Sequence, residues 1–347
     1  MRFTRICDDI DDPREVIVLS RASRARDVAQ AAAVGGAGLV GLGGAFYGLL
    51  LGQSRWARYR IGEPLALPPE PDPHYGDGNT APVRLAILGD SAAAGFGVET
   101  PRETTGALIA HGLAVALNRP VELCCVAVVG AQSGDLQAQV QRSIDFGPEV
   151  AVIMVGANDV THRVTPGRSV ALLTRAVQQL REAGSQVVVG TCPDLGTIRP
   201  IPHPLRWVAR RWSRSLAAAQ TVAVVEAGGR TVALADLVGP EFDAYPDRMF
   251  GPDRFHPSPA GYHALAEAVV PSVVAALSES TQPDAESSIL PIDQAAAVAA
   301  EVGGTEVAAP PTQPSSARWG RRKLRVVLRR RDGDSPAGQS VEADYPV

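Results

Sequence analysis

The chain has 347 residues, of which 45% are hydrophobic, and a formal net charge of -4. This length exceeds that of most single domains, so we expect either two domains or one domain with appended segments. The small net charge gives no general electrostatic basis for binding nucleic acid, and we predict no nucleic-acid partner. The four cysteines lie at no metal-ligand spacing, and two of them are adjacent, so the sequence predicts neither a metal site nor a disulfide framework.

The N-terminal part divides into a polar segment and an apolar one. Residues 1–28 mix acidic and basic side chains without an apolar period, and we interpret them as largely disordered. Residues 29–52 include an uncharged run from Ala31 to Gly52, long enough to cross a hydrocarbon core of about 30 Å as a helix. The sequence therefore predicts a membrane helix, with a buried soluble helix and a cleaved signal peptide as alternatives. Three arginines lie close to each end of the run, so the charges give no orientation.

A Pro-rich linker over 53–81 precedes the folded domain, which we place at 82–278. Within this domain, apolar runs typical of buried strands alternate with segments typical of amphipathic helices. The expected strands are 83–88, 121–129, 150–155, 187–190 and 231–234. Such alternation predicts an α/β fold, a three-layer α/β/α sandwich around a five-stranded parallel sheet.

The C-terminal segment 279–347 is rich in Ala, Pro, Ser and acidic residues, and we predict that it is a disordered tail. A basic segment over 317–331 interleaves arginines with Trp319 and aliphatic residues. Such a segment can bind an anionic membrane surface or remain a solvated charged tail, and both alternatives stay open.

The first strand leads into the turn Gly89-Asp90-Ser91. Ligands of open α/β sheets bind beyond the carboxyl ends of the strands, where N–H groups at a helix start can stabilise negative charge. By itself the triplet also fits an ordinary turn, because all three residue types favour turns. Its position makes Ser91 a candidate nucleophile.

A second polar cluster, Asp253 and His256, directly precedes the last predicted helix. An aspartate three residues before a histidine can accept the Nδ1 proton and leave Nε2 for a serine hydroxyl. His263 lies inside the same helix, and we expect it to have a packing or surface role. Three other polar residues near strand ends are weaker site-lining candidates: Asp194, His203 and Asp236.

Acyl transfer also requires donors for the tetrahedral oxyanion. Gly130 follows the second predicted strand, where the lack of a Cβ lets a backbone N–H approach a substrate oxygen. Asn158 follows the third strand and can donate from its side-chain amide. Glycine and asparagine are also common in ordinary turns, so each residue fits a turn without a catalytic role equally well.

These blocks, taken in chain order, resemble the SGNH hydrolases, also called GDSL-type: Gly-Asp-Ser, a glycine after the second strand, Gly-x-Asn-Asp and Asp-x-x-His-Pro. The resemblance spans 82–277 and implies the flavodoxin-like SGNH fold. It also implies Ser91 as nucleophile and oxyanion donor, Gly130 and Asn158 as further donors, Asp253 as the orienting acid and His256 as the base.

One departure from the family pattern is Val128, where many members have an asparagine, and this weakens the assignment of the glycine that follows.

The resemblance implies a serine hydrolase that cleaves carboxylic esters through an acyl-enzyme, without a metal or organic cofactor. It fits an esterase, a lipase or a carbohydrate O-deacetylase acting on a small-molecule, lipid or glycan ester. A non-catalytic ligand-binding protein or membrane scaffold on the same fold is the alternative. Because an exported esterase has a reason to carry an anchor, we expect a membrane-anchored enzyme with its catalytic domain outside the cytoplasm.

Overall fold

The structure is a computed structural model that describes residues 44–61, 67–279, 289–291, 305–308 and 323–328. It divides into two compact units, Met1–Trp56 and Ala57–Val347. The described residues of the first unit, 44–56, are helical, and the helix continues to residue 61. The predicted disordered segment 1–28 and residues 29–43 of the predicted membrane helix lie outside the described residues. The predicted linker is helical at its start, because 53–61 continue this helix.

Five parallel strands form the centre of the second unit, as the sequence predicts. They are β2 (Val83–Gly89), β3 (Val121–Cys125), β4 (Val150–Met154), β5 (Gln186–Gly190) and β6 (Arg230–Val232). Their spatial order is β3-β2-β4-β5-β6, and neighbouring strands pair in parallel. The second strand in this order, β2, thus carries the Gly-Asp-Ser turn at its carboxyl end, between the ends of β3 and β4.

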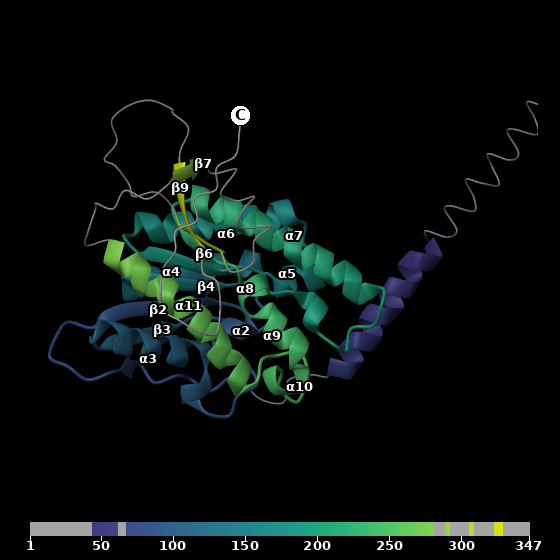
Figure 1. Cartoon of the computed structure of the whole chain (residues 1–347), viewed down its shortest axis with the longest axis horizontal. Coiled ribbons are helices and arrows are strands. Elements are labelled where there is room, and N and C mark those ends of the chain that lie inside the picture. Colours follow the sequence, from purple (N-terminus) through teal and green to yellow (C-terminus); the bar gives the residue numbers. More distant parts are fainter. Residues whose placement is uncertain (1–43, 62–66, 280–288, 292–304, 309–322, 329–347) are drawn as a thin grey trace, which may run out of the picture. The chain divides into compact units, whose positions relative to one another are not determined.

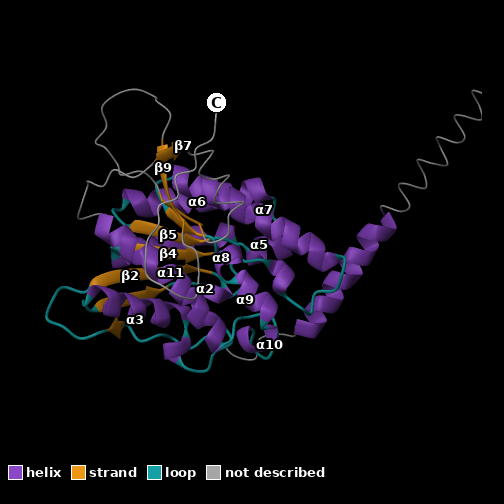
Figure 2. Cartoon of the chain, in the orientation of Figure 1, coloured by secondary structure: helices purple, strands orange, loops and turns teal. Residues whose placement is uncertain are grey.

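Helices cover both faces of this sheet (Figures 1 and 2). The long helices are α3 (Thr105–Leu117), α4 (Leu136–Phe146), α6 (Pro166–Glu182), α7 (Leu205–Glu226) and α11 (Pro259–Glu279). Because side chains of a strand alternate between faces, Leu85 and Ile87 pack in the core that contains α3 and α11. Ala86 and Leu88 pack on the other side, in the core that contains α4 and α6. The predicted three-layer α/β/α sandwich is confirmed.

Short elements connect the strand ends to these helices. They are η1 (Pro101–Glu103), α2 (Ser91–Ala94), η2 (Ser133–Asp135), α5 (Ala157–Thr161), η3 (Leu195–Thr197), α8 (Leu234–Leu237), α9 (Gly239–Ala244) and α10 (Pro246–Met249). Several of them lie directly after a strand, where they position the side chains of the site.

The sheet is wider than predicted: within the described residues it has nine strands rather than five. The strand β1 (His74–Tyr75) pairs antiparallel with β3 at one edge. At the other edge β8 (Thr305–Ala308) pairs antiparallel with β6, followed by β9 (Lys323–Leu328) and β7 (Ile289–Pro291). These three strands lie within the segment 279–347, which the sequence predicts to be a disordered tail; an open sheet edge offers unpaired backbone groups to any short extended segment. The remainder of 279–347 lies outside the described residues.

Among the described residues, α11 is the one helix long and apolar enough to cross a membrane. Its apolar composition has a second explanation, because Tyr262, Val269 and Val273 are fully buried in the core beside α3. A core helix of a soluble domain satisfies the same length and composition criteria. The predicted membrane helix is a different segment, 29–52.

Candidate active site

Ser91 stands at the start of α2, immediately beyond β2. Gly89 ends the strand with a φ of +134°, and a Cβ at this position would lie 1.8 Å from the carbonyl oxygen of Met154. Only glycine allows the backbones of β2 and β4 to approach so closely. The N–H of Asp90 then donates to the same carbonyl at 3.0 Å. This turn leaves Ser91 7% exposed and beside a cavity.

The loop between α10 and α11 carries the other two predicted triad residues. The Asp253 Oδ1 atom accepts the backbone N–H groups of Phe255 at 2.9 Å and of His256 at 3.0 Å. Its Oδ2 atom lies 2.6 Å from His256 Nδ1. His256 Nε2 in turn lies 3.1 Å from Ser91 Oγ. The structure thus brings together the three side chains that the sequence singled out, although 165 positions separate the serine from the histidine.

The imidazole is held by its surroundings as well as by the aspartate. The ring of Phe96 meets that of His256 edge-on at 4.5 Å between centroids, and the ring of Phe255 does so at 4.9 Å. Burial raises the pKa of Asp253, but the hydrogen bonds from the His256 ring and from the N–H of Phe255 outweigh it and hold the pKa below its ordinary value. An ionised Asp253 fixes the Nδ1–H tautomer, which leaves Nε2 free to accept a proton.

The predicted oxyanion donors lie on two loops that contact each other. Gly130 has a φ of +81° and lies in the loop after β3, which the N–H of Val128 ties to the carbonyl of Gly89 at 3.1 Å. Asn158 lies in α5, after β4, and its Nδ2 donates to the carbonyl of Ala131 at 3.1 Å. Both loops therefore belong to the sheet edge at which Ser91 stands.

A buried carboxylate fixes these two loops. Asp159 is fully buried, and it accepts the backbone N–H of Ser133 at 3.1 Å and the Ser133 hydroxyl at 2.6 Å. It also accepts the hydroxyl of Ser169 at 3.0 Å. These contacts join the Asn158 loop to the loop after β3 and to the start of α6. The serine partners of Asp159 carry no sequence signal, because serine is common in turns and near helix starts.

A buried glutamine, Gln139, holds the end of β2. The sequence motifs do not identify it as a residue of the site. The N–H of Gly89 donates to Gln139 Oε1 at 2.7 Å, and Gln139 Nε2 donates to the Gly89 carbonyl at 3.0 Å. Its position in the helix indicates burial, because Gln139 shares the buried face of α4 with Leu136, Val140 and Ser143.

Asp90 is buried beside Ser91, and its Oδ1 atom accepts the N–H of Ala92 at 3.0 Å. Burial raises the pKa of Asp90 to about 6, although the N–H of Ala92 and the nearby His256 both lower it. The carboxyl shapes the serine turn, and its protonation changes in a mildly acidic range.

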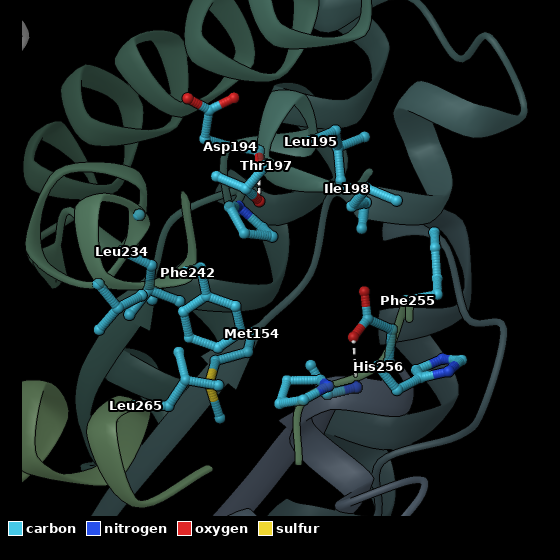
Figure 3. Close-up of a pocket in the computed structure, with 18 of the residues that line it drawn as sticks. Met154, Asp194, Leu195, Thr197, Ile198, Leu234, Phe242, Phe255, His256 and Leu265 are labelled. Atoms are coloured by element: carbon cyan, nitrogen blue, oxygen red, sulfur yellow. Dashed lines mark hydrogen bonds between the residues drawn. The ribbon is translucent and has the colours of Figure 1, made fainter. Parts of the chain in front are cut away.

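An apolar cavity of about 90 Å³ opens beside Ser91 and His256. Figure 3 shows His256 and Phe255 on one side of it and Leu234 and Leu265 across from them. The side chains of Met154 and Phe242 also border the space. An apolar cavity next to a nucleophile suits the hydrocarbon part of a substrate.

The weaker sequence candidates do not join the triad. His263 is exposed on α11, and His203 contacts Arg206 on the surface. Asp236 lies 3.8 Å from Arg214, whereas Asp194 borders the cavity. Among the residues that the structure describes, no group of three potential metal ligands lies close enough together to hold an ion.

A serine at a strand end, hydrogen-bonded to an aspartate-held imidazole on an α/β sheet, is the arrangement of a serine hydrolase. Residues 87–264 match the model of the GDSL-like lipase/acylhydrolase family, and the chain belongs to this family. The resemblance found in the sequence is thereby confirmed, as is the prediction of a GDSL-type esterase; the non-catalytic alternative finds no support.

One relative is the GDSL-like esterase Rv1075c of Mycobacterium tuberculosis, 42% identical over 243 residues, which cover 67% of this chain and 77% of that protein. Solved structures that resemble the chain include the psychrotrophic esterase EstA of a Pseudoalteromonas species, with 19% identity and a TM-score of 0.45, covering 56% of this chain and 98% of that one. An acetyl-xylooligosaccharide esterase of a Geobacillus species has 21% identity and a TM-score of 0.44, covering 57% and 95%.

Proposed function

We propose that this esterase cleaves carboxylic esters through a covalent acyl-enzyme on Ser91. The observation that carries the proposal is the continuous series of hydrogen bonds from Asp253 through His256 to Ser91. A serine hydroxyl is a weak nucleophile, and a neighbouring base that removes its proton during attack overcomes this weakness.

In the first half of the reaction, Ser91 Oγ forms a bond to the ester carbonyl carbon while His256 Nε2 takes the hydroxyl proton. The carbonyl oxygen becomes an oxyanion. Its donors are the N–H of Ser91, the N–H of Gly130 and the second hydrogen of Asn158 Nδ2, whose first hydrogen goes to a backbone carbonyl. Collapse breaks the bond to the alcohol oxygen, and His256 returns the proton to the departing alcohol.

In the second half, a water molecule takes the place of the alcohol. His256 removes a proton from this water, its oxygen bonds to the acyl carbon, and the carboxylic acid leaves while Ser91 regains its proton. Asp253 remains ionised throughout and stabilises the imidazolium formed in each half. The lowered pKa of Asp253 supports this role.

The acyl group of the substrate occupies the apolar cavity. Its lining is mostly aliphatic and aromatic, and it begins at Ser91 and His256. Transfer of a hydrocarbon chain from water into such a space is favourable by about 0.8 kcal/mol for each buried CH₂. The substrate class is therefore a carboxylic ester with an apolar acyl group; esterase, lipase and carbohydrate O-deacetylase activities all fall within it.

Labelling with a fluorophosphonate probe tests this assignment, because the probe phosphonylates an activated serine. We expect labelling of the full chain, its loss in Ser91→Ala, and a strong reduction in His256→Ala. His263→Ala is the matched control, since this histidine is exposed on α11. Undiminished labelling of Ser91→Ala would refute the proposal.

The location of the enzyme is a further part of the proposal. The uncharged run from Ala31 to Gly52 supports a membrane anchor, with the catalytic domain outside the cytoplasm. Protease added to intact cells should then degrade the catalytic domain. Protection of the domain until the cells are lysed would reverse this orientation.

A further inference from the structure

One wall of the acyl cavity is a short turn that follows β5. Leu195, Thr197 and Ile198 border the cavity from this turn, and Asp194 stands at its start as the N-cap of η3. Figure 3 shows these residues together along one edge of the space, with the Asp194 carboxylate directed away from it. The backbone of this residue thus belongs to the wall, while its charge lies behind the wall.

The carboxylate of Asp194 is enclosed and held by two arginines of α7. Its side chain is 2% exposed, and Oδ2 lies 3.2 Å from Arg210 Nε and 3.0 Å from Arg214 Nε. Its Oδ1 accepts the N–H of Gly196 at 2.8 Å. A buried carboxylate without a partner would be strongly destabilising, so the turn is stable in this position only while α7 supplies the arginines.

Two more contacts fasten the same turn to α7. The N–H of Leu195 donates to Ser213 Oγ at 3.2 Å. A Cβ on Gly196 would lie 2.3 Å from Arg210 Nε, so the arginine runs directly over the glycine backbone. Together with Asp194, these contacts form what we call the η3 clamp: Asp194, Gly196, Arg210, Ser213 and Arg214.

We propose that the η3 clamp sets the acyl-chain selectivity of the enzyme, with Asp194 as the positioning residue. The inference rests on the proposed function, because it requires the acyl group to occupy this cavity. A wall held by two ion pairs cannot retreat to admit a longer chain, and it keeps close contact with a chain that fits. Without the ion pairs the turn that forms this wall can move. Acyl chains that fit the rigid cavity then bind less tightly, and longer acyl chains are no longer excluded.

The test compares the wild-type chain with Asp194→Asn on p-nitrophenyl esters from acetate to octanoate. Asparagine is nearly isosteric and keeps an oxygen for the N–H of Gly196, but it loses the charge that binds the arginines. We expect kcat/KM for the best wild-type chain length to fall about ten-fold, mainly through KM, and the preference among chain lengths to flatten. Labelling of Ser91 by a small fluorophosphonate without an alkyl chain should stay within about two-fold of wild type.

Arg199→Gln is the matched control. Arg199 follows the same turn and makes an ion pair with Asp243 at 3.1 Å, but both side chains are about half exposed and neither borders the cavity. An exposed ion pair of this kind contributes little to the stability of the fold. Its removal should leave the chain-length profile unchanged.

Variants of Arg210 and Arg214, the two arginines that bind Asp194, give a second, independent test. Removal of both arginines in Arg210→Gln/Arg214→Gln leaves the carboxylate buried and unpaired, so the double variant should lose more selectivity than Asp194→Asn. Addition of Asp194→Asn to that double variant should then restore part of the loss, because the unpaired charge is gone. The single arginine variants allow the same comparison if the double variant does not fold.

A folded Asp194→Asn variant with the wild-type chain-length profile would overturn the proposal. An equal loss for every chain length, together with slower labelling of Ser91, would also overturn it, because the clamp would then support the catalytic centre in general. Failure of the proposed function is a separate result: the wild-type chain itself would neither react with the fluorophosphonate at Ser91 nor hydrolyse any ester of the series.

Discussion

The buried carboxyl of Asp90 makes the stability of the fold depend on pH in an unusual direction. Most aspartates have a lowered pKa in the folded state, whereas burial raises the pKa of Asp90 from 3.8 to about 6. The folded protein therefore binds this proton more tightly than the unfolded chain does. The stabilising effect of the proton is fully present below about pH 4 and is lost as the pH rises through about 6.

The magnitude follows from the two pKa values. The difference between 3.8 and about 6 corresponds to about 3 kcal/mol of unfolding free energy, lost between pH 4 and pH 7. Asp90→Asn removes the titration and keeps a side-chain oxygen that can accept the N–H of Ala92. The amide carries its own cost in this buried position, about 1–3 kcal/mol for an unpaired N–H group, but that cost does not depend on pH.

The assay is urea unfolding of both proteins at several pH values from 4 to 8. The stability of Asp90→Asn minus that of wild type should rise by about 3 kcal/mol between pH 4 and pH 7 and then stay constant. The constant cost of the amide cancels in this comparison. A flat difference across the range would show that Asp90 does not titrate as its burial requires, and a falling difference would refute the sign of the argument.

Three further substitutions test the serine turn and its base. Asp253→Asn should lower kcat for ester hydrolysis on the order of 10³- to 10⁴-fold while unfolding changes little, because the imidazole loses the tautomer that accepts a proton. Gly89→Ala should destabilise the fold by about 3 kcal/mol or more in urea unfolding, since its Cβ would lie 1.8 Å from the Met154 carbonyl oxygen. Gly134→Ala is the control and should not destabilise the fold, because open space surrounds its Cβ. Gln139→Leu should lower the unfolding free energy by about 1–3 kcal/mol, because it leaves the buried backbone N–H of Gly89 unpaired, while the Gly89 carbonyl keeps the N–H of Val128.

The central sheet could be predicted because its strands are buried on both faces. Runs such as Val83–Gly89 and Val150–Met154 are almost wholly apolar, a pattern typical of parallel strands covered by helices. The edge strands could not be predicted in the same way. Both outer strands are short: Thr305–Ala308 lies among alanines, glycines and prolines, and Lys323–Leu328 lies among arginines. Their pairing depends on an edge of the sheet that is distant in sequence.

The triad could be predicted because its parts are local motifs. The turn at Ser91 and the three-residue spacing from Asp253 to His256 each have a physical meaning within a few residues, and a parallel sheet collects such turns at one edge. The supporting contacts have no local pattern. Gln139 reaches Gly89 across 50 positions, and its place on the buried face of α4 indicates burial but does not identify Gly89 as its partner.

Three buried aspartates at the carboxyl edge of the sheet show how partners decide the role of a charge. Asp159 accepts hydrogen bonds from Ser133 and Ser169, which join two loops near the proposed oxyanion donors. Asp194 faces two arginines and so couples the cavity wall to α7.

In the part of the chain that the structure describes, the Asp90 carboxyl accepts backbone N–H groups of its own turn, which cannot offset its burial, and its pKa rises. A neutral isostere should therefore be tolerated at Asp90 above pH 7. At Asp194 the same replacement should alter what the cavity accepts, because there the charge itself makes the contact between elements. The sequence shows three aspartates that each follow a strand, and their difference lies entirely in what surrounds them.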